Sequence, residues 1–108
     1  MGYTVYYEGR SKSPLTQADQ ALITRNTEQF AANMSDESEG YGWDIGKDGL
    51  SMSGATKPAL DDPEMETDIQ VLVDAVTALS RALPHVTFRV TDDFESVLFS
   101  STDPEQHH

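Results

Sequence analysis

The densest group of residues that could do chemistry is a run of acids just past the middle of the chain. Its weak candidates for metal ligands are Asp61, Asp62, Glu64 and Glu66. Calcium and magnesium prefer oxygen ligands, so such a run could hold one of them loosely. Acids are also favoured at the positive end of a helix dipole, and a helical pattern follows this run directly. We therefore interpret the run mainly as a solvated loop that begins a helix, and we expect no metal site and no cofactor.

Nucleophilic catalysis has few residues to draw on. The chain has no cysteine, which excludes a thiol nucleophile and disulfide bonds. A serine nucleophile would need His85 as its base, because His107 and His108 occupy the last two positions. His85 follows a proline in a short connection, where a lone histidine is more often a turn residue than a base. Nucleophile-elbow, phosphate-loop and dinucleotide-binding motifs are absent, so we expect a protein that is not an enzyme.

Charge is the outlying property of the composition. Nineteen acids face seven bases in 108 residues, which gives a formal net charge of −12. A field of this sign repels phosphates and anionic membranes, so we expect neither a nucleic acid nor a membrane as partner. A low lysine content beside many acids is also typical of halophilic proteins. The acidity therefore has two interpretations, which are recognition of a basic partner and adaptation to high salt.

Targeting signals are not evident in the sequence. No stretch approaches the roughly 20 apolar residues that a membrane span needs. The first residues lack the basic segment and apolar run of a signal peptide. We therefore expect a cytoplasmic protein.

The first half of the chain predicts strand, helix and hairpin in that order. Residues 3–8 are rich in aromatic and β-branched types and predict a strand. A helix is predicted from Thr16 to residue 34, and the spacing of Thr16 and Asp19 is that of a capping box. Residues 41–45 and 50–53 flank an Asp-Gly turn signal and predict a β-hairpin.

The second half of the chain predicts a helix followed by two strands. Residues 69–83 carry the clearest helical stripe, with Asp68 as the expected N-cap and Thr67 as the alternative. The stripe consists of Ile69, Leu72, Val73, Val76, Leu79 and Leu83. Alternating residues over 85–91 predict a strand, an aspartate turn follows at 92–93, and residues 97–99 predict a short additional strand.

This order of elements predicts an α+β fold of the ferredoxin-like βαββαβ type. Two right-handed βαβ units would form a two-layer sandwich with an antiparallel sheet and both helices on one face. A possible extra C-terminal strand would extend the sheet. We expect residues 1–101 to form a single domain and residues 102–108 to form a flexible tail with acids and two histidines. The sequence resembles no specific family that we recognise, and an order of elements does not fix a function.

The aromatic residues suggest an interaction surface. Successive strand residues point to opposite faces, so the tyrosines of the first predicted strand cannot all be in the core. Those on the helix-free face would form an apolar patch with acids around it, which is typical of protein–protein interfaces. Our predicted interface consists of Tyr6, Tyr41, Trp43 and Arg89. The alternative is that a terminal strand or the tail covers this patch.

We therefore predict a small, acidic, non-catalytic protein-binding module. It would self-associate as a homodimer or dock on a protein partner through the aromatic sheet face. One alternative is an acidic inhibitor, of the immunity type, that neutralises a basic nucleic-acid-binding partner. The other is a salt-adapted protein of a different role. Clustered acids would favour neutralisation, and evenly spread acids would favour salt adaptation.

Overall fold

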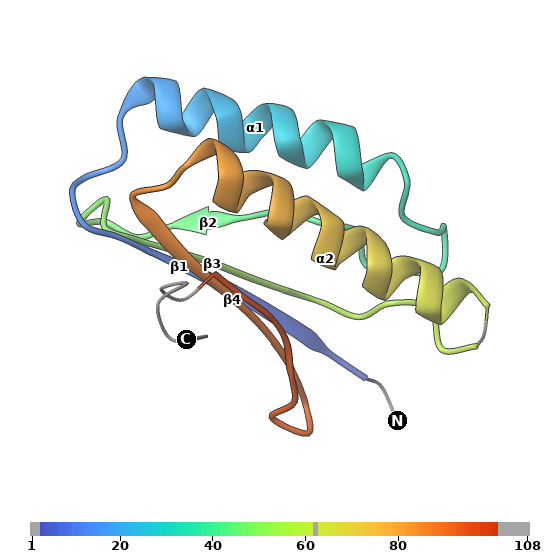
Figure 1. The fold of residues 1–108 in the computed structure, drawn as a ribbon. Coiled ribbons are helices and arrows are strands. Elements are labelled where there is room, and N and C mark those ends of the chain that lie inside the picture. Colours follow the sequence, from blue (N-terminus) through green and yellow to red (C-terminus); the bar gives the residue numbers. More distant parts are fainter. Residues whose placement is uncertain (1–2, 62, 102–108) are drawn as a thin grey trace.

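The computed structural model describes residues 3–61 and 63–101, which form two helices and a five-stranded antiparallel sheet (Figure 1). The elements are β1 (Val5–Ser11), α1 (Gln17–Ala31), β2 (Asp44–Ile45), β3 (Ser51–Thr56), α2 (Glu64–Ala82), β4 (Val86–Asp92) and β5 (Val97–Ser100). The strand order across the sheet is β2-β3-β1-β4-β5, and every neighbouring pair is antiparallel. The predicted α+β class, the antiparallel sheet and the additional C-terminal strand are confirmed. The predicted tail at 102–108 lies outside the described residues.

Both helices lie on the same face of the sheet, an arrangement compatible with a two-layer sandwich (Figure 1). The core lies between the layers and is built from alternate residues of the central strands and the apolar stripe of α2. Its largest fully buried side chains include Tyr7, Phe88, Met52, Leu72 and Leu79. Within residues 3–61 and 63–101, no helix lies on the opposite face of the sheet.

Strand β1 is the centre of the sheet and pairs with both β3 and β4. It continues to Ser11, three residues beyond the predicted strand, and it therefore includes Gly9. A Cβ atom at Gly9 would lie 2.8 Å from Phe88 Cε1 and 2.9 Å from Met52 Cγ. The glycine is therefore a site of close packing inside a strand, where the sequence pattern indicated a connection.

Helix α1 begins with the predicted capping box. Thr16 Oγ1 accepts a hydrogen bond from the Asp19 backbone N–H at 3.1 Å, and Asp19 Oδ2 accepts one from the Thr16 N–H at 3.0 Å. The same carboxylate lies 3.1 Å from His85 Nε2. The backbone hydrogen bond from Thr16 and then the contacts with His85 lower the pKa of Asp19. The helix ends at Ala31, earlier than predicted.

Helix α2 begins at Glu64, so the prediction of Asp68 as its N-cap was wrong. Pro63 is at the N-cap position. Proline is tolerated at a helix start because the first N–H groups have no partner within the helix. Acids are favoured there by the positive end of the helix dipole. Asp68 lies in the second turn and is fully buried. Its carboxylate accepts hydrogen bonds from Ser35 N (2.8 Å), Ser35 Oγ (2.7 Å) and Ala59 N (2.8 Å). Asp68 therefore joins α2 to the loops that follow α1 and β3.

The predicted hairpin is formed by β2 and β3. Asp48 Oδ1 accepts a hydrogen bond from Leu50 N at 2.9 Å, and Gly49 has a φ of 71°. These are the roles that an Asp-Gly turn predicts. Strand β2 is limited to Asp44–Ile45, so the aromatic residues before it, Tyr41 and Trp43, lie outside the regular strand.

Candidate functional site

The helix-free face of the sheet, which we call the open face, is mostly polar. Strand β1 directs Tyr6, Glu8 and Arg10 to this face. Their neighbours across the ladders are Ala55, Ser53 and Ser51 in β3 and Thr91, Arg89 and Thr87 in β4. Tyr6 is 45% exposed, and it is the aromatic side chain that these three central strands direct outward. Antiparallel sheets commonly keep one solvated face of this kind.

Tyr41 and Trp43 lie on the other side of the sheet, so the four residues of the predicted interface do not share one surface. Tyr41 is only 7% exposed, and its hydroxyl donates a hydrogen bond to Asn26 Oδ1 of α1 at 2.6 Å. Trp43 Nε1 donates a hydrogen bond to the Tyr41 hydroxyl at 2.6 Å. The Trp43 ring packs edge-on against the Phe88 ring, with 5.7 Å between the ring centroids. Burial raises the pKa of Tyr41. Large aromatic rings with a satisfied polar tip are stable in a core, which explains their inward position.

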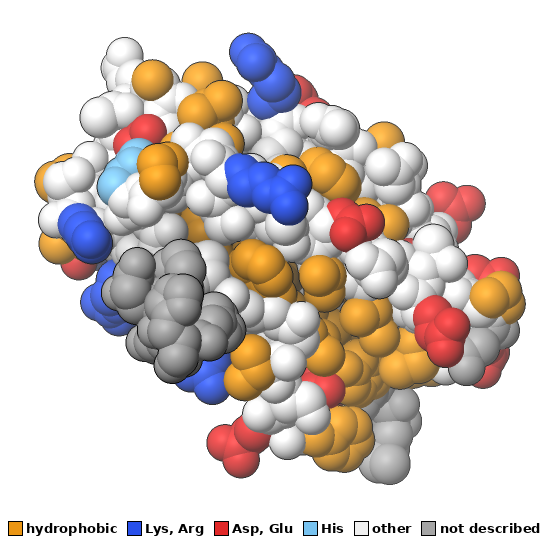
Figure 2. All heavy atoms as spheres, viewed as in Figure 1, with side chains coloured by type: hydrophobic (Ala, Val, Ile, Leu, Met, Phe, Trp, Pro, Cys, Tyr) orange, Lys and Arg blue, Asp and Glu red, His pale blue; other side chains and the backbone are white. Residues whose placement is uncertain are grey.

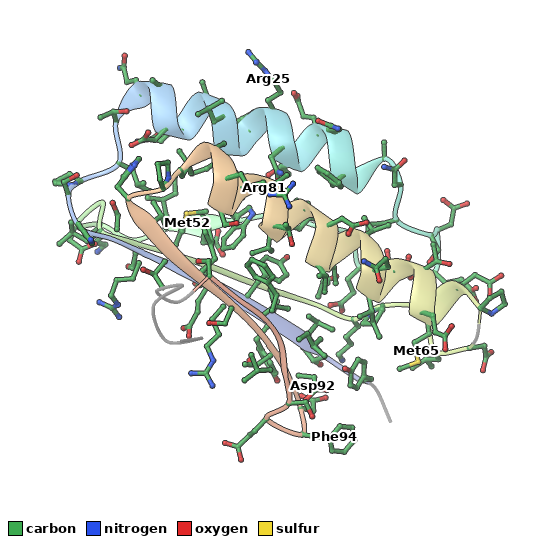
Figure 3. The ribbon with its side chains drawn as sticks, viewed as in Figure 1. Arg25, Met52, Met65, Arg81, Asp92 and Phe94 are labelled. Atoms are coloured by element: carbon green, nitrogen blue, oxygen red, sulfur yellow. The ribbon has the colours of Figure 1, made fainter. Side chains whose placement is uncertain are left out.

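The turn between β4 and β5 exposes an aromatic residue that the predicted interface did not include. Phe94 is 78% exposed, the highest value among the large hydrophobic residues described. Figure 3 shows it at the tip of the turn, with its ring beside the turn. Its ring stacks on Tyr3 at a centroid distance of 6.1 Å.

Asp92 organises this turn. Its Oδ1 accepts hydrogen bonds from the backbone N–H groups of Phe94 and Ser96, each at 2.9 Å, and its Oδ2 accepts one from the Tyr3 hydroxyl at 2.7 Å. Burial acts to raise the pKa of Asp92, but these hydrogen bonds outweigh it, and the pKa lies below its ordinary value. Glu95 has a φ of 61°, which closes the turn tightly. The carboxylate thus fixes the backbone that carries Phe94.

Asp93 connects the same turn to β1. Its carboxylate accepts hydrogen bonds from Thr4 N at 2.8 Å and from the Tyr6 hydroxyl at 2.9 Å. The hydrogen bond to Asp93 raises the pKa of Tyr6. Burial and the hydrogen bond to Asp92 raise the pKa of Tyr3 to about 12. We use the name aromatic end for this cluster, which consists of Tyr3, Tyr6, Phe94 and Val97.

One group of exposed acids lies around the start of α2. On the face drawn in Figure 2, most Asp and Glu side chains lie around the start of α2 and at the β4–β5 turn, with hydrophobic side chains between them. The loop after α1 and the start of α2 meet at this end, where Lys57 N donates to Glu39 Oε1 at 3.1 Å. We name six exposed residues here the acidic end: Asp36, Glu37, Glu39, Asp61, Glu64 and Glu66.

The weak metal candidates belong to the acidic end. Asp61, Glu64 and Glu66 are exposed at the start of α2, and Asp62 lies outside the described residues. Within residues 3–61 and 63–101, no three acids or histidines come together in a way that could hold a metal ion. Sequence proximity alone does not make carboxylates converge, because those on a helix point outward in different directions.

Arg89 lies near the middle of the open face, where it lines a basic hollow of about 730 Å³. The cationic residues in its lining are Arg10, Lys12 and Arg89, and hydroxyl groups come from Ser51, Ser53 and Thr87. Glu8 is its acidic residue. On the open face, Tyr6, Asp93 and Glu95 line a neighbouring hollow that shares Glu8 and Arg89 with the basic hollow.

Comparison of the chain with protein-family models, with curated proteins and with solved structures finds no match. Neither helix in the described part of the chain is long and apolar enough to cross a membrane. Functional inference therefore depends on the geometry of the described residues.

Proposed function

We propose that this protein is a protein-binding module that docks on a partner through its aromatic end. The observation that carries this proposal is Phe94, which is 78% exposed on a turn fixed by Asp92. Interface hot spots are commonly aromatic residues that fill a pocket of the partner, and a fixed backbone reduces the entropy lost on binding. An exposed aromatic ring is unfavourable in water, and a partner that covers the ring would remove this cost.

The charges around Phe94 indicate the chemistry of the partner. Asp93 and Glu95 flank Phe94 and are exposed. A partner with an apolar pocket and lysine or arginine around it would complement both features. Two copies docked symmetrically through Phe94 would instead place these acids against their own equivalents, which is unfavourable. We therefore favour a different, basic partner over the homodimer.

A homodimer through the central open face is also less favourable than a basic partner. Interface centres are depleted of charged residues, whereas β1 and β4 place Glu8, Arg10 and Arg89 at the middle of this face. Light scattering at micromolar concentration tests this step. We expect a monomer, and a dimer that persists in Phe94→Ala would contradict it.

A second candidate function is neutralisation of a basic surface by the acidic end. It is favoured by the six exposed carboxylates that two adjoining loops bring together. An inhibitor of a nucleic-acid-binding protein would use such a surface, and its association would be fast and sensitive to salt. Salt adaptation and a cytoplasmic location remain predictions.

We also propose that the fold is ferredoxin-like. Its support is the order β4-β1-β3-β2 within the sheet, which two interleaved βαβ units would produce. In this description β5 is an addition beside β4. The proposal for the partner does not depend on this classification.

Photo-cross-linking in the native cells tests the two functions against each other. A photoreactive phenylalanine analogue would replace Phe94, Leu60 or Thr24 in separate variants. Leu60 is 63% exposed beside the acidic end, and Thr24 is an exposed residue of α1 that serves as the background control. We expect one protein to be linked from position 94, at an apolar site flanked by basic residues. A partner linked only from position 60 would support neutralisation, and equal products from all three positions would refute both.

A further inference from the structure

The basic hollow is unusual in a protein of net charge −12 because it holds three of the seven lysine and arginine residues. These are Arg10, Lys12 and Arg89. Among residues 3–61 and 63–101, none of the three has a carboxylate oxygen within 4.0 Å, since the ion pair found there joins His85 and Asp19. Three cationic groups and Glu8 leave a formal charge of +2 in the lining.

The strand register sets the positions of these groups. Arg10 lies opposite Thr87 on one side and Ser51 on the other, and Arg89 lies opposite Glu8. The two arginines therefore rise from neighbouring strands toward the same side of the sheet. Each guanidinium presents several N–H donors in a planar fork that matches carboxylate and phosphate groups. The serine and threonine hydroxyls of the lining add further donors.

We propose that the basic hollow binds a small oxyanion ligand, with a phosphate or carboxylate group held between Arg10 and Arg89. The volume of about 730 Å³ lies within the range of small-molecule sites. Asp92, Asp93 and Glu95 line the adjoining hollow together with Arg89, and acids that lie more than about 8 Å from the basic hollow are largely screened at physiological salt. This site is separate from the aromatic end, so it neither requires nor excludes the proposed function.

A polymeric anion fits the surface less well than a small one. A nucleic-acid strand that left the hollow along β1 and β4 would meet Asp93 and Glu95, which line the adjoining hollow together with Arg89. Like charges there would oppose the chain of phosphates. A small ligand would contact only the basic half.

Calorimetric titration of the full chain with pyrophosphate and, separately, with citrate tests the proposal. We expect saturable binding of at least one of them with a Kd of about 1 mM or tighter in buffered sodium chloride near physiological ionic strength. Tighter binding of pyrophosphate would identify phosphate as the preferred group, and tighter binding of citrate would identify carboxylate. Absence of a saturable response to both up to about 10 mM would overturn the proposal.

Charge variants separate a built site from a diffuse charge effect. Arg89→Gln and Arg10→Gln should each weaken binding by roughly tenfold or more, because each removes charge-assisted hydrogen bonds. Glu8→Gln should strengthen it, because it removes the carboxylate from the lining. The matched control is Arg25→Gln, since Arg25 projects from α1 on the helix side (Figure 3). An equal loss in Arg25→Gln would overturn the proposal, and thermal melting would verify that each variant is folded.

Discussion

Replacement of Asp68 by alanine should destabilise the fold strongly, although it removes one negative charge from a helix that carries several acids. The side chain is fully buried and accepts three hydrogen bonds, from Ser35 N, Ser35 Oγ and Ala59 N. Through them it connects α2 to two loops that are far apart in sequence. The carboxylate is therefore one of the groups that hold the helix layer on the sheet.

The magnitude follows from the donors that alanine would leave without an acceptor. Ala59 is almost fully buried, so its unpaired N–H should cost about 1–3 kcal/mol. The half-buried Ser35 N–H is partly accessible to water and should cost about 1 kcal/mol, and the lost hydroxyl contact adds a similar amount. The total is about 3–5 kcal/mol, a large part of the roughly 5–15 kcal/mol that stabilises a typical domain.

Urea denaturation followed by the fluorescence of Trp43 measures this effect. With a slope of about 1.5 kcal/mol per molar, the urea midpoint of Asp68→Ala should fall by about 2–3 M. Asp74→Ala is the matched control, because Asp74 is exposed on the same helix and accepts a hydrogen bond only from the Gln70 side chain. It removes the same charge and should change stability by less than about 0.5 kcal/mol. Equal effects of the two variants would refute the structural role of Asp68.

The pH dependence of this contribution has a definite sign. Burial acts to raise the pKa of Asp68, but the hydrogen bonds from Ser35 and Ala59 outweigh it, and the pKa lies below its ordinary value. The ionised carboxylate therefore contributes fully above the unfolded-state pKa, which is about 3.9. The contribution is lost as the pH falls through the lower pKa of the folded state. The stability difference between the wild type and Asp68→Asn should consequently shrink as the pH falls below about 4.

Three further predictions concern other parts of the fold. The pKa of Tyr3 is raised to about 12, which favours the protonated phenol in the folded state. The stability that this phenol contributes is therefore full below pH about 10 and should be lost as the pH rises toward 12. Ultraviolet titration of the wild type against Tyr3→Phe measures the pKa of Tyr3. Thr16→Ala should cost about 1 kcal/mol in urea denaturation by removing the capping box, whereas Thr24→Ala should not. Gly54→Ala should destabilise the fold far more than Gly42→Ala. A Cβ atom at Gly54 would clash with the Tyr7 ring and the Gly42 carbonyl, whereas a Cβ atom at Gly42 would meet open space. Equal melting temperatures of the two variants would contradict this packing.

Salt gives a fourth prediction, which separates the two interpretations of the acidity. If the acids adapt the protein to salt, molar potassium chloride should raise the melting temperature markedly by screening the repulsion within the acidic end. A melting temperature that stays nearly constant would favour recognition of a basic partner. Calorimetric melting over a potassium chloride series measures this.

The elements with local signals could be predicted from the sequence. The capping box of α1, the Asp-Gly turn and the apolar stripe of α2 depend on residues that are close together in the chain. The start of α2 could not be placed, because the role of Asp68 depends on Ser35 and Ala59, which lie in separate loops. Gly9 was misplaced for a similar reason, since Phe88 and Met52 fill the space beside it.

The candidate surface was predictable only in part. Alternation in β1 correctly placed Tyr7 on one face and Tyr6 on the other, whereas Tyr3 lies before the strand begins at Val5. The position of Tyr41 depends on a partner in α1, Asn26, that no local pattern indicates. Phe94 carried a signal that could have been used, because an aromatic residue directly after an Asp-Asp turn stands where polar residues are usual.

The most direct test of the docking proposal measures the affinity of the partner identified by cross-linking. Phe94→Ala should raise its Kd by roughly thirtyfold, equivalent to about 2 kcal/mol, as expected for a buried aromatic hot spot. Leu60→Ala removes another exposed apolar side chain and should leave the Kd within about threefold of the wild type. Higher salt should weaken binding through the acids beside Phe94. A Kd that Phe94→Ala leaves unchanged would contradict docking through the aromatic end.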